Sequence, residues 1–115
     1  MKIVNRDEFL LLPANTVYSL SGWTAGAPDT TVNGFFIKGD TVAGVDYYQQ
    51  TIPDFDWNDT SDHFDKIKAA VDGGENLKLD ARTETRNGMF DKDQLYFVWD
   101  REDISILIDR LKECL

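Results

Sequence analysis

The chain has 115 residues, of which 21 are Asp or Glu and 12 are Lys or Arg, so its net charge is −9. This charge argues against nucleic acids and anionic membranes as partners, because both bind to basic surfaces. The hydrophobic fraction of 42% excludes a disordered acidic tail, and the length fits a single domain comprising residues 1–115.

The acidic residues are concentrated in the first part of the chain. Residues 7–65 contain ten acidic residues and one basic residue, Lys38, and so carry a net charge of −9 by themselves. The last 50 residues are nearly balanced, with a net charge of −2. The sequence therefore predicts one acidic surface and one surface of mixed charge.

Cysteine usage and hydropathy indicate the compartment. The single cysteine, Cys114, cannot form an internal disulfide, which favours a reducing cytoplasm. The apolar run Phe9–Leu12 is too short for a signal peptide or a membrane span. We therefore expect a soluble, cytoplasmic protein.

The first half of the chain predicts strands with one short helix. Residues 2–4 form the first strand, and a helix capped by Asn5 ends before Pro13. A second strand covers residues 17–20 and a long loop covers residues 22–34. A hairpin follows, with strands at residues 35–37 and 41–50 and its turn at 38–40.

The second half predicts two helices separated by strands. The helix at residues 61–72 is capped by Ser61 or Asp62 and ended by Gly73-Gly74. Strands follow at residues 77–85 and 94–99, separated by the turn Asn87-Gly88. Asp100 caps the last helix. The two helices carry apolar stripes at helical spacing, made of Phe64, Ile67, Ala70 and Val71, and of Ile104, Leu107, Ile108, Leu111 and Leu115.

This order of elements predicts an α+β protein. We expect a single domain with an antiparallel sheet of about five or six strands and two or three helices packed on one face.

The acidic loop that precedes the helix at residues 61–72 partly matches a calcium-binding loop. Asp54, Asp56, Asn58 and Asp65 occupy positions 1, 3, 5 and 12 of the EF-hand pattern. Position 6, where the pattern requires glycine, is Asp59. The alternative is a solvated acidic loop whose carboxylates lie at the start of the helix.

The residues that usually carry catalysis occur singly. His63 and Cys114 are the only residues of their types, which excludes the usual zinc sites, and no Gly-x-Ser-x-Gly or phosphate-binding glycine motif is present. The sequence therefore predicts neither an enzyme nor a bound cofactor.

The segment at residues 78–86 places Lys78, Arg82 and Arg86 on one face of a predicted strand, interspersed with acidic residues. One interpretation is a solvated face with cross-strand ion pairs. The other is a pocket for a nucleotide, in which these three cations contact phosphate and Tyr47 stacks on the base.

Several aromatic residues lie outside the predicted core. Trp23 and Trp57 fall in loops, and Tyr48 faces the side of the sheet opposite to Tyr47. Such residues next to carboxylates are typical interface anchors, although packing beneath loops is the alternative. The predicted partner-binding surface comprises Trp23, Tyr48, Asp54, Asp56, Trp57, Asp59 and Asp62.

Three stretches of the chain resemble small accessory proteins encoded by phages and prophages. They are Val4-x-Arg6-x-Glu8-Phe9-x-x-Leu12-Pro13-x-x-Thr16-x-Tyr18, then Phe36-Ile37-Lys38-Gly39 with Asp46-Tyr47-Tyr48-Gln49, and finally Asn87-Gly88-x-Phe90-Asp91-x-x-Gln94-Leu95-x-x-Val98-Trp99. The resemblance implies a protein of the host bacterial cytoplasm. Such proteins often inhibit host defence systems by binding rather than by catalysis.

Three functional hypotheses follow. The first is a binding protein whose acidic surface covers a basic surface of a host protein. The second is a protein that sequesters a nucleotide signal at Arg82 and Arg86. The third is an enzyme of unknown class. A homo-oligomer is compatible with each of them.

Overall fold

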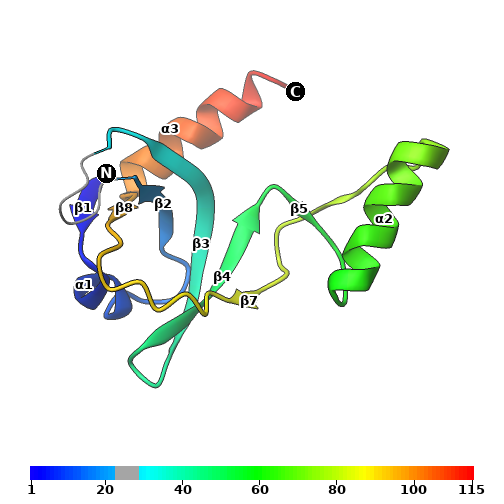
Figure 1. Cartoon of the computed structure of the whole chain (residues 1–115). Helices are drawn as coiled ribbons and strands as arrows, with labels where there is room; N and C mark the ends of the chain where they lie inside the picture. Colours follow the sequence, from blue (N-terminus) through cyan, green and yellow to red (C-terminus); the bar gives the residue numbers. More distant parts are fainter. Residues whose placement is uncertain (23–28) are drawn as a thin grey trace.

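A six-stranded antiparallel sheet, in the order β1-β8-β2-β3-β4-β7, forms the body of the protein (Figure 1). The computed structural model describes residues 1–22 and 29–115. Their elements are β1 (Lys2–Val4), α1 (Arg6–Leu10), β2 (Val17–Ser21), β3 (Val32–Val42), β4 (Asp46–Ile52), β5 (Asp54–Phe55), α2 (Thr60–Gly73), β6 (Leu79–Asp80), β7 (Thr85–Arg86), β8 (Tyr96–Val98) and α3 (Arg101–Lys112). The predicted α+β class is confirmed.

The centre of the core is one phenylalanine of α1 surrounded by three tyrosines of the sheet. Asn5 caps α1, its side chain accepting a hydrogen bond from the backbone N–H of Glu8 at 2.9 Å. The Phe9 ring stacks on Tyr96 at a centroid distance of 3.9 Å. Tyr18 and Tyr47 meet the same ring edge-on at 4.7 and 4.9 Å. All four side chains are buried, so α1 closes this face of the sheet.

The β3–β4 hairpin turns later than predicted. β3 continues through Lys38 to Val42, with a register shift between Lys38 and Thr41. Lys38 is buried, and its ammonium group donates to Gly39 O and to Thr41 Oγ1 at 3.0 and 2.8 Å. The irregularity at the predicted turn is therefore a bulge that satisfies a buried lysine. The turn itself lies at Ala43 and Gly44, which both have positive φ, as tight hairpin turns require.

Two other predicted segments also differ from the structure. The loop expected up to residue 34 ends earlier, because β3 begins at Val32 and pairs with Ser21. The single strand expected at residues 77–85 is divided. β6 pairs with β5 in a separate two-stranded sheet, whereas β7 pairs with β4 in the main sheet. The predicted common face of residues 78–86 does not form.

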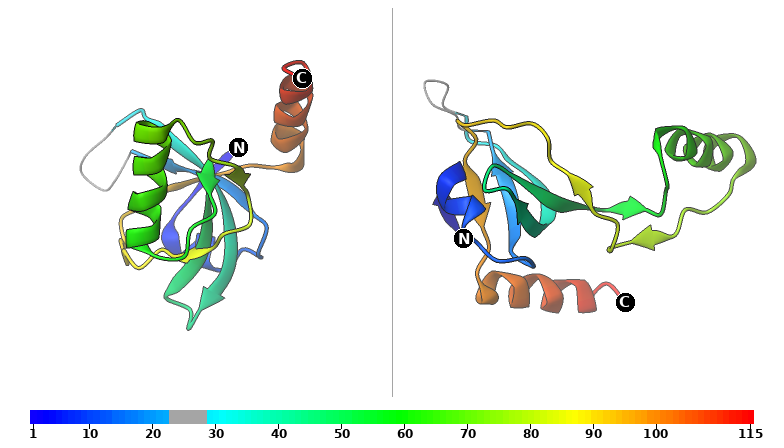
Figure 2. Two further views of the ribbon diagram at one scale, coloured as in Figure 1. Left: turned by 90° about the vertical axis from the view of Figure 1, so that its right-hand side faces the viewer. Right: turned by 90° about the horizontal axis from the view of Figure 1, so that it is seen from below.

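Helices α2 and α3 project away from the sheet (Figure 2), and neither contains a buried residue. The predicted cap at Asp100 is confirmed, and the left-handed Gly74 ends α2 as expected. Asp59, rather than Ser61 or Asp62, caps the start of α2. The radius of gyration is 16.0 Å, against about 13 Å for a compact domain of about 100 residues.

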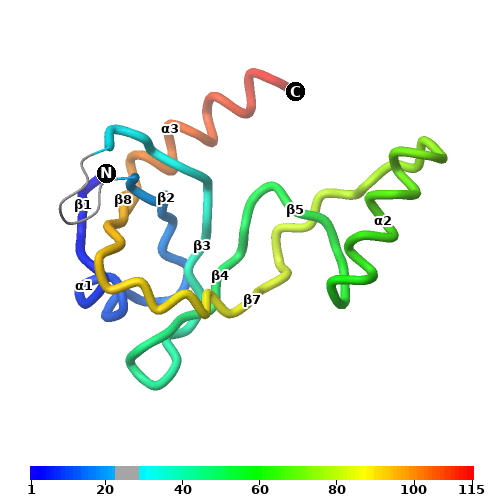
Figure 3. Tube along the Cα trace, viewed as in Figure 1, coloured from blue at the N-terminus to red at the C-terminus, as the bar shows by residue number. Residues whose placement is uncertain are grey.

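In the Cα trace, α2 lies beyond β5, α3 follows β8, and the C-terminus lies beyond the last turn of α3 (Figure 3). Within the described residues, no helix is both long and apolar enough to cross a bilayer.

We expect Phe9→Ala to lower the free energy of unfolding by about 3–5 kcal/mol, because it removes the ring that the three tyrosines surround. Leu11, at the end of the same helix, is 86% exposed. Leu11→Ala is the matched control, with an expected change below about 0.5 kcal/mol. Urea unfolding measures both, and equal losses in the two variants would contradict this assignment of the core.

Candidate functional site

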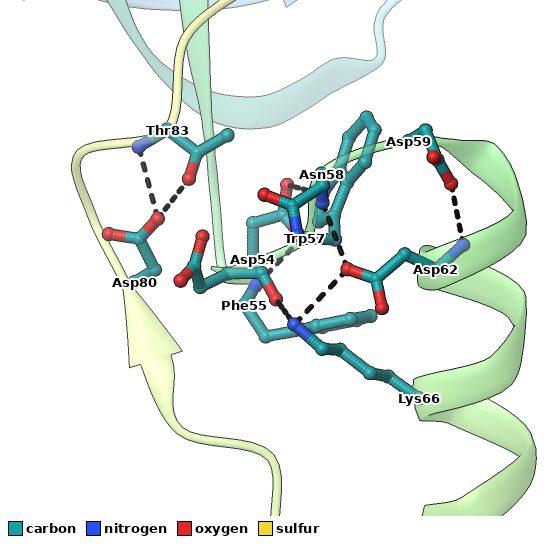
Figure 4. Close-up of polar contacts among 10 residues, drawn as sticks. Asp54, Phe55, Trp57, Asn58, Asp59, Asp62, Lys66, Asp80 and Thr83 are labelled. Atoms are coloured by element: carbon teal, nitrogen blue, oxygen red, sulfur yellow. Dashed lines mark hydrogen bonds and ion pairs between the residues drawn. The ribbon is translucent and has the colours of Figure 1, made fainter.

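The predicted partner-binding acids lie together on a projecting unit made of β5, α2 and β6. We call this unit, residues 54–80, the α2 arm. It contains eight acidic residues and three lysines, so its net charge is −5. Asp54 lies on β5, Asp59 caps α2 and Asp62 lies in the first turn of α2 (Figure 4). The structure therefore places the predicted partner-binding acids Asp54, Asp56, Asp59 and Asp62 on one unit.

Three of these carboxylates hold the arm together. Asp59 accepts a hydrogen bond from the N–H of Asp62 at 2.8 Å, and the Asp62 carboxylate accepts one from the N–H of Asn58 at 3.0 Å. The Asn58 hydrogen bond, together with Lys66 at 3.3 Å, lowers the pKa of Asp62 below its ordinary value. Asp54 accepts a hydrogen bond from the Trp57 indole at 3.2 Å. These groups are committed to local structure, as Figure 4 shows.

The aromatic residues at the base of the arm pack against one another. His63 lies between Phe55, stacked at a centroid distance of 4.8 Å, and Trp57, which meets it edge-on at 5.2 Å. These contacts fix the first turn of α2 on β5. Trp57 is half-buried here, so its ring belongs largely to the internal packing of the arm.

The other predicted partner-binding residues lie elsewhere. Tyr48 is on β4 of the main sheet, beside Arg86, whose guanidinium carbon is 5.8 Å from the Tyr48 ring centre. Trp23 falls outside the described residues. The predicted anchors Tyr48 and Trp57 are therefore divided between the sheet and the arm.

The outer side of α2 carries an apolar stripe. Phe64, Ile67 and Val71 are 66%, 40% and 76% exposed, and their spacing places them on one helix face. The opposite side faces the body of the arm, where the ammonium group of Lys66 donates to the Asp56 carbonyl at 2.6 Å. Polar residues therefore attach α2 to the rest of the arm, and the apolar stripe stays exposed. The sequence periodicity predicts this stripe, but the expected packing of the helix on the sheet does not occur.

Asp56 and Asp65 are two of the acids of the arm whose carboxylates make none of these hydrogen bonds. Both side chains are exposed, and no cation of the described residues pairs with either carboxylate. They contribute charge to the surface of the arm without a structural role that the contacts reveal.

The calcium-like spacing does not assemble a metal site. Among residues 1–22 and 29–115, no three carboxylate, histidine or cysteine side chains are grouped so that they could hold a metal ion. Asp54 is bound to the Trp57 indole and Asp65 lies on the helix, within a regular turn. The loop enters α2 directly instead of wrapping around a central ion, so Asp54, Asp56, Asn58 and Asp65 do not converge.

The predicted nucleotide pocket at residues 78–86 is not assembled either. Lys78 and Arg82 line an open cavity of about 450 Å³, together with the acidic residues Asp56 and Asp80. Arg86 does not line this cavity, and it pairs with Asp46. Tyr47 points into the core and is 1% exposed. Its neighbour Tyr48 faces the other side of the sheet, because alternate residues of a strand face opposite sides. The four predicted ligand residues therefore do not share a site.

Asp46 is a buried carboxylate that orders the sheet edge. It is fully buried and accepts hydrogen bonds from Arg86 at 2.8 Å and from the N–H of Gly88 at 3.1 Å. Burial acts to raise the pKa of Asp46. Three hydrogen bonds lower the pKa, and they come from Arg86 and from the N–H groups of Tyr47 and Gly88. Together with the positive charge of Arg86, they outweigh the effect of burial. The ion pair therefore attaches β7 and the following turn to β4.

Comparisons with family models, with curated protein sequences and with solved structures found no match to this chain. Its own residues carry the functional argument.

We expect Asp46→Asn to lower the free energy of unfolding by about 2 kcal/mol at neutral pH, because charged hydrogen bonds to a buried group are lost. The folded pKa of Asp46 lies below the ordinary value of 3.8, so the carboxylate stabilises the fold above that pH. This stabilisation disappears as the pH falls through the folded pKa.

Chemical denaturation between about pH 2 and pH 7 measures the difference between the wild type and this variant. The difference should be constant near neutral pH and shrink in acid. Asp93→Asn, at an exposed carboxylate, is the control and should show little change. A difference for Asp46→Asn that grows in acid would contradict the sign of the pKa shift.

Proposed function

We propose that this protein is a non-enzymatic binding protein that docks on a basic surface of another protein through the α2 arm. The observation that carries the proposal is the exposure of Phe64, Ile67 and Val71 on a helix that buries none of its residues. The resemblance to phage-encoded accessory proteins supports a host bacterial protein, such as a component of a defence system, as the partner.

The apolar stripe has the pattern of a helix that binds in a groove. Anchors at positions i, i+3 and i+7 present three side chains along one face, which is how amphipathic helices bind to apolar grooves of partner proteins. Contiguous exposed apolar patches that are rimmed by polar residues mark interaction sites. Burial of the three side chains in a groove would supply the hydrophobic part of the binding energy.

The charge of the arm favours a basic partner. With a net charge of −5, the arm would be attracted to a surface rich in Lys and Arg, which speeds association and selects against acidic partners. Two copies of this chain would instead bring arms of like charge together, which opposes self-association at this surface. We therefore choose a basic protein over a second copy as the occupant.

The test is affinity capture from a bacterial lysate with the wild-type protein and with the Phe64→Asp/Ile67→Asp double variant. We expect the wild type to retain a defined basic protein and the double variant to lose it. Ile106→Asp is the matched control, because Ile106 is 61% exposed on the other projecting helix. Added salt should weaken the interaction, since screening reduces the attraction between exposed charges.

Charge reversal separates the electrostatic part of this proposal. Asp56→Lys and Asp65→Lys should slow association of the captured protein by about tenfold or more, with little effect on the fold, because neither carboxylate has a described structural partner. Retention of the same protein by the Phe64→Asp/Ile67→Asp variant, or capture of nothing by the wild type, would refute the proposal.

A further inference from the structure

A second cavity lies away from the α2 arm. It is formed by α1, the β3–β4 turn and the segment that joins β7 to β8. Its volume is about 460 Å³, within the range of small-molecule sites. Figure 3 shows the segment between β7 and β8 running from the hairpin toward α1. Arg6, Asp7, Val45, Phe90 and Lys92 are among the residues that line it.

The guanidinium of Arg6 is buried without a counter-charge. Arg6 is 6% exposed, and it donates to the Tyr96 hydroxyl at 3.2 Å and to the Val45 carbonyl at 2.7 Å. No carboxylate of residues 1–22 or 29–115 forms an ion pair with it. Buried arginines are almost always paired, because an isolated buried charge is costly. Arg6 has five N–H donors, of which two make these hydrogen bonds.

We propose that this cavity binds a small organic phosphate of mononucleotide size, with its phosphate group between Arg6 and Lys92. A phosphomonoester carries a charge of about −1.5 to −2 at neutral pH. Two cations therefore neutralise a phosphomonoester more closely than they neutralise a carboxylate, which has a single negative charge. Arginine binds phosphate through two parallel hydrogen bonds, and lysine binds it as a point charge. Asp7 is the one carboxylate among the described lining residues, and its negative charge disfavours longer polyphosphates.

The backbone at Phe90 supports an organic ligand rather than phosphate alone. Phe90 has a φ of 51°, a left-handed conformation that bulky residues rarely adopt. Its ring is 52% exposed and lines the cavity. Strained backbone of this kind is concentrated at ligand-binding positions, and an exposed aromatic ring offers a stacking surface for a base. This assignment does not depend on the function proposed for the α2 arm.

The test is titration of the isotope-labelled full-length protein with AMP, inorganic phosphate, adenosine and benzoate, followed by NMR. We expect saturable shifts with AMP at a Kd of about 1 mM or tighter, confined to residues around Arg6, the β3–β4 turn and Phe90. Phosphate should bind more weakly at the same residues. Adenosine, which lacks the charge, and benzoate, which carries a carboxylate, should produce weaker shifts than AMP.

Four variants locate the site. Arg6→Met and Lys92→Met should each weaken AMP binding by about tenfold or more, and Lys92 is exposed, so the second variant should fold normally. Phe90→Asn should weaken AMP binding but leave phosphate binding unchanged, because asparagine tolerates the left-handed backbone. Asp7→Asn should tighten AMP binding.

Four results would each overturn the assignment. They are the absence of saturable shifts with AMP, shifts with AMP that lie away from the cavity, normal AMP binding by Lys92→Met, and benzoate binding as tight as that of AMP. Phosphate binding without AMP binding would overturn the mononucleotide-sized ligand. None of these results involves Phe64 or Ile67, so they are distinguishable from failure of the protein-binding proposal.

Discussion

The enclosure of Phe9 by three tyrosines is the contact on which the rest of the structure depends. Tyr18, Tyr47 and Tyr96 come from β2, β4 and β8, so a single side chain of the five-residue helix α1 joins three strands. The tyrosine hydroxyls also keep polar partners: Tyr47 and Tyr96 lie 3.3 Å apart, and Tyr18 donates to Gln49 at 2.9 Å. Aromatic pairs in these edge and stacked arrangements add to simple burial.

This short helix covers the core without help from α2 or α3. The sheet obtains its closed face from α1, and the two longer helices keep their apolar side chains on the surface. An isolated helix of 12 to 14 residues is marginal in water, so α2 needs its cap at Asp59 and its attachments through His63 and Lys66 to persist as a helix. The protein thus leaves an apolar helix face exposed to solvent, which the proposed binding role would explain.

The two proposed surfaces differ in charge and in chemistry. The α2 arm combines an exposed apolar stripe with a net charge of −5, which suits a basic protein. The cavity at Arg6 combines a buried cation with an exposed aromatic ring, which suits a small organic phosphate. The overall charge of −9 reflects the acidic arm and gives no sign of the cavity at Arg6, because one buried cation contributes little to the total charge.

The sequence by itself determined the α+β class, the caps at Asn5 and Asp100 and the end of α2 at Gly74, because these depend on neighbouring residues along the chain. Tertiary structure decided what each apolar or charged face meets. The stripe of Phe64, Ile67 and Val71 has the periodicity of a core helix, and only the tertiary structure shows that it lies on the surface. Arg86 pairs with Asp46, 40 residues away, and Lys38 is buried in a bulge rather than a turn. Such pairings join residues that are far apart in the sequence, and they depend on strand register, in which a slip of one residue moves every side chain to the other face.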